Sequence, residues 1–142
     1  MTVYIVDASI VVEYIIAGPY TPNAKTLFNG ALHGDQFTAP ELYLAECVNV
    51  IWKMVRFRGM PSNQAIQALR DLKAMPIKRA AIKGVLAPAL AIGLKHELAI
   101  YDSLYIALAL KTGSVFITID TKQQRAASAE GTTVKPITHF KP

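Results

Sequence analysis

The sequence predicts an α/β protein with a mostly parallel central sheet. Short apolar runs rich in β-branched residues alternate with longer segments of helical periodicity, the pattern of repeated βαβ units. The two strongest runs, residues 2–6 and 114–119, show no polar alternation, as expected of strands buried on both faces. The chain has 142 residues, of which 52% are hydrophobic. We therefore expect a single domain spanning residues 1–142.

Hydrophobic periodicity, together with Gly and Pro residues that interrupt regular structure, predicts the further elements. We expect short strands at 36–39 and 76–79, and a weak last strand at 133–135. Helices are expected from residue 9 to about 17, and at 23–33, 41–58, 62–73, 85–98, 102–111 and 121–129. The helix at 102–111 is almost wholly apolar after its first two residues, so we expect it to be buried.

The helices at 41–58 and 62–73 carry apolar stripes. The inward-facing residues predicted for them are Leu44, Ala45, Val48, Ile51, Trp52, Val55, Ile66, Leu69 and Leu72. The same stretch, residues 44–72, could instead supply hydrophobic contact area for partner proteins. The pattern does not divide its residues between these two uses.

Charge and cysteine content narrow the class of protein. The chain carries 15 Lys and Arg against 10 Asp and Glu, a net charge of +5 that suits a polyanionic partner such as nucleic acid. The lone Cys47 allows no internal disulfide or cysteine-rich zinc site, and we expect it to be a small buried hydrophobe. No membrane-spanning or signal segment is apparent, so we expect a cytoplasmic protein.

Asp7 and Asp120 occupy matching positions, each directly after a strong apolar strand and before a helix. Ligands of open parallel sheets bind beyond the carboxyl ends of the strands. If the two strands are neighbours, about 4.8 Å apart, their carboxylates converge and must share a proton or hold a cation. Each residue could instead serve only as a helix N-cap.

Glu46 and Asp102 complete a set of four acids. Glu46 is expected mid-helix among apolar neighbours, where a carboxylate needs a partner, a metal or a raised pKa, unless it is solvated or paired with Lys53. Asp102 is expected to open the buried helix, with an N-cap as its alternative role. The six other acids are outnumbered by the 15 basic residues. An acidic site on an otherwise basic protein suits a metal-dependent nuclease, because the acids can hold metal ions and the basic surface can bind phosphates.

Four segments, 6–9, 40–50, 101–109 and 117–120, together resemble the PIN-domain family, and most closely its VapC-type toxins of prokaryotic toxin–antitoxin pairs. The resemblance runs from residue 3 to about residue 135. It implies a three-layer α/β/α fold, metal-dependent cleavage of RNA, a homodimer, and an antitoxin that inserts a segment near the acidic site. It assigns the catalytic and metal-binding roles to Asp7, Glu46, Asp102 and Asp120, and supporting hydroxyl roles to Ser9 and Thr118.

The chemistry of the four acids selects the cofactor. Carboxylate oxygens, without clustered Cys or His, favour Mg²⁺ or Mn²⁺ over zinc. Candidates for contacts with RNA phosphates are Lys53, Arg56, Arg58 and Arg125, with a second basic stretch at Lys78, Arg79 and Lys83. We expect His33, His96 and His139 to be ordinary surface or loop residues. The sequence assigns no role to Glu13.

Three alternatives remain open at this level. The chain could be a PIN nuclease of RNA maturation or of structured DNA, or an RNA-binding module without catalysis. It could also be a phosphotransfer protein, since receiver domains and haloacid-dehalogenase-like phosphatases place an Asp after their first strand. The phosphatases need a second Asp where this chain has Ser9. Receivers need a central strand-end Asp that is missing here.

Overall fold

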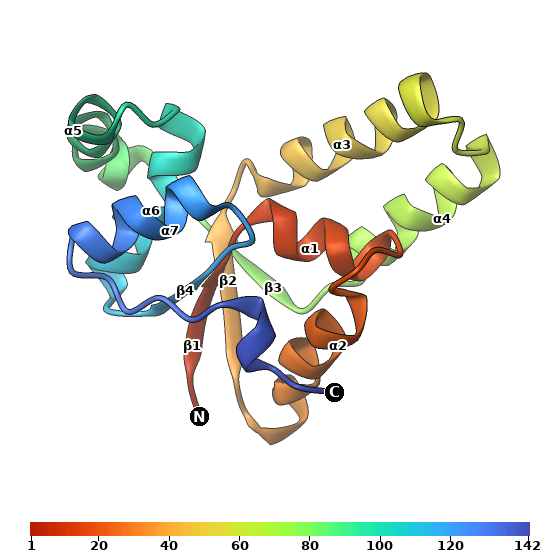
Figure 1. Cartoon of the computed structure of the whole chain (residues 1–142), viewed down its shortest axis with the longest axis horizontal. Helices are drawn as coiled ribbons and strands as arrows, with labels where there is room; N and C mark the ends of the chain where they lie inside the picture. The colour runs from red at the N-terminus through yellow and green to blue at the C-terminus, as the bar shows by residue number, and fades with distance from the viewer.

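The computed structural model describes residues 1–142 and contains one four-stranded sheet, in the order β3-β2-β1-β4 (Figure 1). The strands are β1 (Val3–Val6), β2 (Gln36–Pro40), β3 (Ile77–Ala80) and β4 (Val115–Ile117). Every neighbouring pair is parallel, so the expected mostly parallel sheet is in fact entirely parallel. β1 lies at the centre, where Ile5 pairs with Thr38 on one side and with Phe116 on the other.

The order of the strands creates a switch point beside β1. The chain passes from β1 to β2 to β3 in one direction, and then returns across the sheet to place β4 on the other side of β1. Such a reversal leaves a crevice at the carboxyl ends of the two strands that flank it. In this fold those ends belong to β1 and β4, the strands that precede Asp7 and Asp120.

Helices flank the sheet on both sides, and the predicted three-layer arrangement is confirmed (Figure 1). One side carries α1 (Ala8–Ile15) and α2 (Thr21–Asn29), and the other carries α5 (Leu86–His96), α6 (Ile100–Thr112) and α7 (Thr121–Ala129). Residues 103–109 of α6 are all buried, as expected from the apolar run. α6 packs on β1 and β2, with α5 against it.

The two remaining helices form a projecting arm. α3 (Tyr43–Arg58) and α4 (Ser62–Lys73) pack against each other and reach away from the sheet (Figure 1). Only part of the arm joins the core, through residues such as Cys47 and Leu72. The predicted inward stripe is therefore partly wrong: Trp52 and Ile66 are each 54% exposed, and Val48 is 41% exposed. Helical periodicity identified an apolar face correctly, but no other element covers it.

Smaller differences concern the ends of elements. The expected strand at 133–135 contributes only one isolated bridge, between Phe116 and Val134. Three short 3-10 helices, η1 (Gly30–His33), η2 (Lys83–Val85) and η3 (Ile137–His139), complete the chain.

Glu13 supports the turn between α1 and α2, where its carboxylate accepts a hydrogen bond from the Tyr20 amide. None of the helices combines the length and the apolar character needed to cross a membrane.

Candidate active site

Asp7 and Asp120 meet at the switch point. β1 and β4 are direct neighbours, with Val6 opposite Ile117, and the Asp7 amide continues the ladder to the Ile117 carbonyl at 3.0 Å. Both acids also cap helices. The Asp7 carboxylate accepts from the Ser9 amide at 3.3 Å, and that of Asp120 accepts from the Gln123 amide at 3.0 Å. Capping and convergence therefore coexist, because the strand end and the helix start are the same residue.

Thr118 lies at the centre of the hydrogen bonds around Asp7. Its side chain is fully buried, and its hydroxyl is 3.0 Å from Oδ2 of Asp7. The same hydroxyl oxygen accepts from the Asp120 amide at 3.1 Å, and the Ser9 hydroxyl lies 3.4 Å away. Ser9 in turn accepts from the Ile119 amide at 3.3 Å. The two hydroxyl residues singled out in the sequence thus fix the position of Asp7 and the turn that carries Asp120.

Gln123 is a part of this network that sequence reasoning missed. Its side chain is 1% exposed, and its Oε1 is 2.9 Å from the Thr118 hydroxyl. Its Nε2 donates to the main-chain carbonyl of Asp102 at 3.3 Å, which ties α7 to the first turn of α6. A buried amide is tolerated only when its polar atoms have partners. Its signal in the sequence is weak, because a Gln in a polar helix is ordinarily exposed.

Glu46 lies in the first turn of α3, not in the middle of the helix as expected, because residues 41 and 42 form a turn. Its carboxylate accepts a 2.7 Å hydrogen bond from the hydroxyl of Tyr105, a buried residue of α6 that the sequence did not single out. Burial, together with the charges of Asp7 and Asp102, raises the pKa of Glu46 to about 7, against the lowering effect of the hydrogen bond from Tyr105. No ion pair joins Glu46 to Lys53.

Asp102 lies in the first turn of α6, two residues after the helix begins. The alternative role as an N-cap is wrong, because Ala99 occupies that position and no side chain caps the helix. Desolvation raises the pKa of Asp102, and the charges of Asp7 and Asp120 raise it further, while Lys122 lowers it. The pKa of Asp7, whose side chain is buried, is also raised by desolvation, against the lowering effect of its hydrogen bonds.

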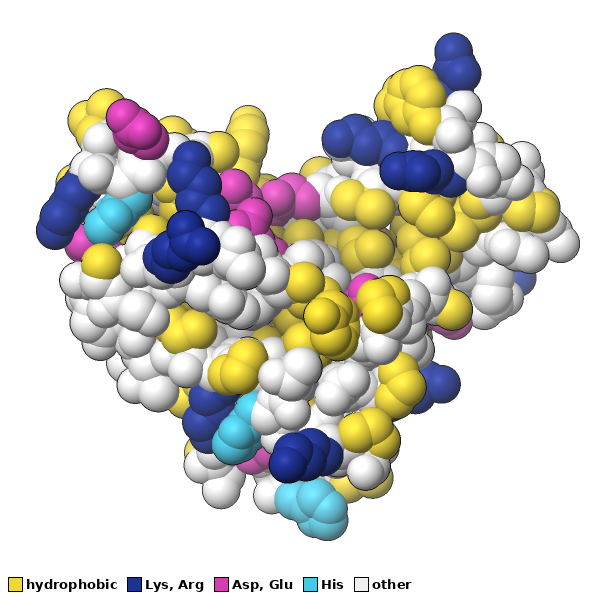
Figure 2. Space-filling model, viewed as in Figure 1, with side chains coloured by type: hydrophobic (Ala, Val, Ile, Leu, Met, Phe, Trp, Pro, Cys, Tyr) yellow, Lys and Arg dark blue, Asp and Glu magenta, His cyan; other side chains and the backbone are white.

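These mutual effects place the four carboxylates around one space. Figure 2 shows acidic side chains gathered in the notch between the α5–α7 side of the molecule and the α3–α4 arm. Their donor chemistry fits a hard divalent cation, which would relieve the like-charge repulsion that, together with desolvation, raises the pKa of Glu46 and Asp102. As the side chains stand, no three of them are close enough to enclose one ion. The residues fit the cofactor in kind and location, and the structure does not define a coordination geometry.

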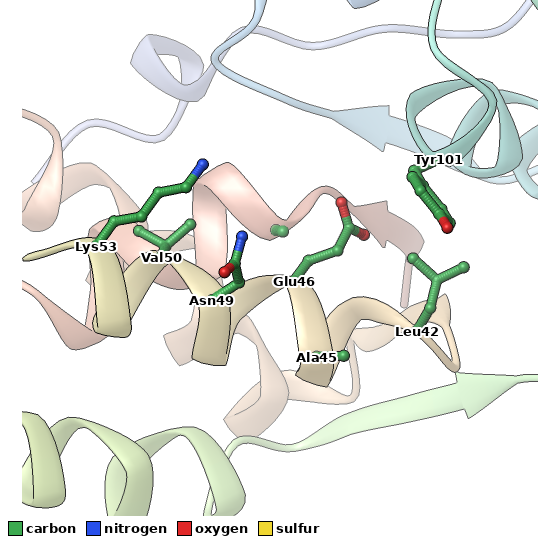
Figure 3. A pocket seen from close by; sticks show the side chains of 8 residues that line it. Leu42, Ala45, Glu46, Asn49, Val50, Lys53 and Tyr101 are labelled. Carbon is green, nitrogen blue, oxygen red and sulfur yellow. The ribbon is translucent and has the colours of Figure 1, made fainter. Parts of the chain in front are cut away.

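A cavity of about 510 Å³ opens beside Glu46. Its lining comes from α1, from α3 with the turn before it, and from α6, and consists of Ala8, Leu42, Ala45, Glu46, Asn49, Val50, Lys53 and Tyr101. Figure 3 shows Asn49 and Lys53 projecting from α3 on the same side as Glu46, with Tyr101 opposite Glu46 and Leu42. The cavity thus shares Glu46 with the acidic notch.

A family model described as PIN domain matches residues 4–129, most of the chain. The chain belongs to the PIN domain family. A relative, Ribonuclease VapC3 of Pyrobaculum aerophilum, is 29% identical over 120 residues, which cover 82% of this chain and 88% of the relative. The chain is thus a distant homologue of VapC ribonucleases.

Two solved structures share the fold of this PIN domain. The protein PAE2754 of Pyrobaculum aerophilum has a TM-score of 0.70 at 16% identity, over 97% of this chain and 91% of its own. VapBC2 of Rickettsia felis, solved bound to a DNA fragment from its promoter, has a TM-score of 0.68 at 13% identity, over 95% of this chain and 98% of its own. At these identities the likeness concerns the fold alone.

The basic residues of this PIN domain lie at unequal distances from the acids. Lys53 lines the same cavity as Glu46. Arg56 and Arg58 lie farther along α3, about 15 and 18 Å from Glu46 at the rise of an α-helix. Arg125 lines a different hollow, with Gln124 and Ser128. Lys122, which the sequence analysis did not name, carries a positive charge that lowers the pKa of Asp102.

The remaining candidate nucleophiles and bases stand outside the acidic notch. Cys47 is buried as expected, and desolvation raises its pKa to about 12, so its thiol stays protonated and unreactive. His33 and His139 are exposed, as expected. His96 is half-buried and contacts Glu130 at 2.8 Å, a link between α5 and the end of α7. No histidine is placed to act as a general base beside the four acids.

Proposed function

We propose that this PIN domain is a metal-dependent endoribonuclease, acting as the toxin of a toxin–antitoxin pair. The observation that carries the proposal is the convergence of Asp7, Glu46, Asp102 and Asp120, from four separate segments, at the switch point of the sheet. A purely structural role does not explain it, because burial and the neighbouring like charges raise the pKa of Glu46 and Asp102, which opposes folding at neutral pH. Relationship to VapC ribonucleases supports RNA as the substrate.

The four carboxylates would hold Mg²⁺ or Mn²⁺, whose bound state lowers the pKa of a coordinated water and offsets charge on the phosphodiester. Thr118 and Ser9 fix the orientation of Asp7, and Gln123 fixes Thr118. Tyr105 holds Glu46 on the α3 side of the notch. These contacts restrain Asp7 and Glu46 before a cation arrives, and binding would require the four carboxylates to move closer together.

Basic side chains flank the acids on both sides, which supports a polyanionic substrate (Figure 2). Lys53 and Arg56 are exposed on α3, and Lys122 and Arg125 are exposed on α7. RNA lying along the notch would pass between these two rows, with its phosphates near the cations and one phosphodiester at the carboxylates. This division of charge explains how a site of four acids accepts a polyanion.

The partner proposed for the exposed apolar face of the arm is the antitoxin. Val48, Ile51, Trp52, Val55, Ala65, Ile66 and Leu69 line a hollow between α3 and α4 of about 280 Å³, with no polar residue among them. Homologues of this PIN domain, VapBC2 among them, have been crystallised as toxin–antitoxin complexes, which supports an antitoxin as the partner. A segment of the antitoxin seated in this hollow would continue toward the acidic notch, because α3 contributes to both.

A second copy of the chain is proposed to cover α5. Leu86, Leu90 and Leu94 recur every four residues on one face of this helix and are 47%, 52% and 74% exposed. Such a ridge matches the contact stripe of helix pairs in symmetric dimers. Size-exclusion chromatography with light scattering should give the mass of a dimer, and Leu90→Glu should give that of a monomer.

Cleavage of RNA by wild type and Asp7→Asn in Mg²⁺ or Mn²⁺ tests the activity. We expect Asp7→Asn to keep the fold and lose cleavage, whereas the matched control Asp71→Asn, on the surface of α4, should cut normally. Undiminished cleavage by Asp7→Asn would reject the site. Expression in a host cell then tests the toxin role: growth arrest by wild type but not by Asp7→Asn supports it, and cleavage without arrest favours a maturation nuclease.

A further inference from the structure

The cavity beside Glu46 is placed to receive a part of the substrate other than the scissile phosphate. Three of its lining residues belong to the acidic site or adjoin it in sequence. Glu46 is itself one of the four acids, Ala8 follows Asp7, and Tyr101 precedes Asp102. Its volume of about 510 Å³ lies within the range of small-molecule binding sites. Any chain held at the carboxylates therefore has its neighbouring groups at the mouth of this cavity.

Tyr101 offers an aromatic face without a partner in the protein. It is 63% exposed, although the seven residues at 103–109 of the same helix are buried. Its ring pairs with no other aromatic ring or cation, and its hydroxyl makes no hydrogen bond, unlike that of Tyr105. An exposed aromatic ring at the edge of a nucleic-acid site is a platform on which a base can stack.

The opposite wall supplies free polar groups. Glu46, Asn49 and Lys53 recur at helical spacing along one side of α3 and point toward the same space (Figure 3). Neither Asn49 nor Lys53 has a hydrogen-bond or ion-pair partner in the structure, and both side chains are exposed. An amide carries both donor and acceptor groups for the edge of a base, and a Lys ammonium binds phosphate.

We propose that this cavity binds one unpaired nucleobase adjacent to the scissile phosphodiester. The base stacks on Tyr101, its edge is read by Asn49, and Lys53 contacts a neighbouring phosphate. This inference rests on the proposed nuclease function and adds a specificity-determining site, a pocket for one base beside the cleaved bond. Duplex RNA does not fit, because its bases are stacked on each other and their faces are not accessible.

Binding without cleavage tests the cavity directly. The probes are single-stranded oligoribonucleotides that carry 2-aminopurine, a fluorescent base quenched by stacking, at each position in turn. The protein is the Asp7→Asn variant in Mn²⁺, which is expected to bind RNA without cutting it. We expect quenching at one position, and adding Tyr101→Ala should remove the quenching and weaken binding about tenfold. Tyr101→Phe should retain both, because the ring is kept.

An abasic ribonucleotide at the quenched position separates stacking from general binding. Removing the base should weaken RNA binding to the Asp7→Asn protein about tenfold. The protein that also carries Tyr101→Ala should bind the abasic RNA and the intact RNA with equal affinity. The matched control is Phe57→Ala, which removes an exposed aromatic ring from the far end of α3. It should change neither quenching nor affinity. The corresponding RNA duplex should bind more weakly than the single strand and show no dependence on Tyr101.

Two results would overturn the inference. One is equal quenching and affinity with and without Tyr101→Ala, and the other is an abasic penalty that persists in the Tyr101→Ala protein. Either would leave the cavity to another occupant, such as a side chain of the antitoxin. Failure of the nuclease proposal looks different: wild type would not cut RNA in Mg²⁺ or Mn²⁺, while the dependence of the stacking signal on Tyr101 could still be measured.

Discussion

Replacing Glu46 by Gln should stabilise the protein at neutral pH in the absence of divalent cations. The substitution removes a charge that burial and the neighbouring acids Asp7 and Asp102 disfavour. It retains an oxygen that can accept the hydrogen bond from Tyr105, so the local packing is preserved. The effect should therefore report electrostatics rather than loss of a contact.

The magnitude follows from the pKa of Glu46, which rises from an ordinary value of 4.5 to about 7. Between these values the folded protein keeps a proton that the unfolded chain has released, so stability falls as the pH increases. At about 1.4 kcal/mol for each tenfold change in the dissociation constant, the full effect is about 3 kcal/mol. Because the side chain is partly solvated, screening should reduce it to about 1–2 kcal/mol.

Urea denaturation at about pH 5 and about pH 8, with EDTA present, measures this effect. Wild type should lose about 1–2 kcal/mol more than Glu46→Gln between the two conditions, and Mn²⁺ should restore stability to wild type more than to the variant. The matched control is Glu41→Gln, which removes an exposed acid from the turn before α3 and should follow wild type. Identical pH dependence of wild type and Glu46→Gln would refute the reasoning.

Two further substitutions address residues whose surroundings became clear only in the fold. Gln123→Leu removes the amide that holds Thr118 and the first turn of α6, so it should raise the Mn²⁺ concentration needed for cleavage about tenfold, while the exposed Gln67→Leu should not. An unchanged Mn²⁺ requirement would contradict the role of Gln123. Trp52→Ala should leave RNA cleavage intact and weaken binding of the cognate antitoxin, measured by calorimetry, by about tenfold or more. Equal antitoxin affinity would remove the arm hollow from the interface.

The strands and the positions of Asp7 and Asp120 were predictable because their signals are local. An apolar β-branched run marks a buried strand, and an acid directly after it lies at the strand end whatever the rest of the chain does. Their convergence required one further fact, the adjacency of β1 and β4, which the sequence left as a condition and the pairing of Val6 with Ile117 showed.

The side chains that support the acids were not predictable in the same way. Tyr105 reaches Glu46 across 59 positions of sequence, and Thr118 reaches Asp7 across 111. The hydroxyl of Thr118 was found only through resemblance, and Tyr105 was hidden among the apolar residues of α6. Gln123 was hidden for the opposite reason, because polar neighbours in α7 made it look like a solvated residue.

By itself the sequence determined most of the segments that form strands and helices, which face of each helix is apolar, and which acids stand at strand ends. Only the tertiary structure decided what covers those faces: the stripe on α3 and α4 lies on an arm and stays largely open, whereas α6 is enclosed. The reason is that periodicity reflects the chemistry of one element, while burial, pKa and hydrogen bonding depend on elements that are distant along the chain.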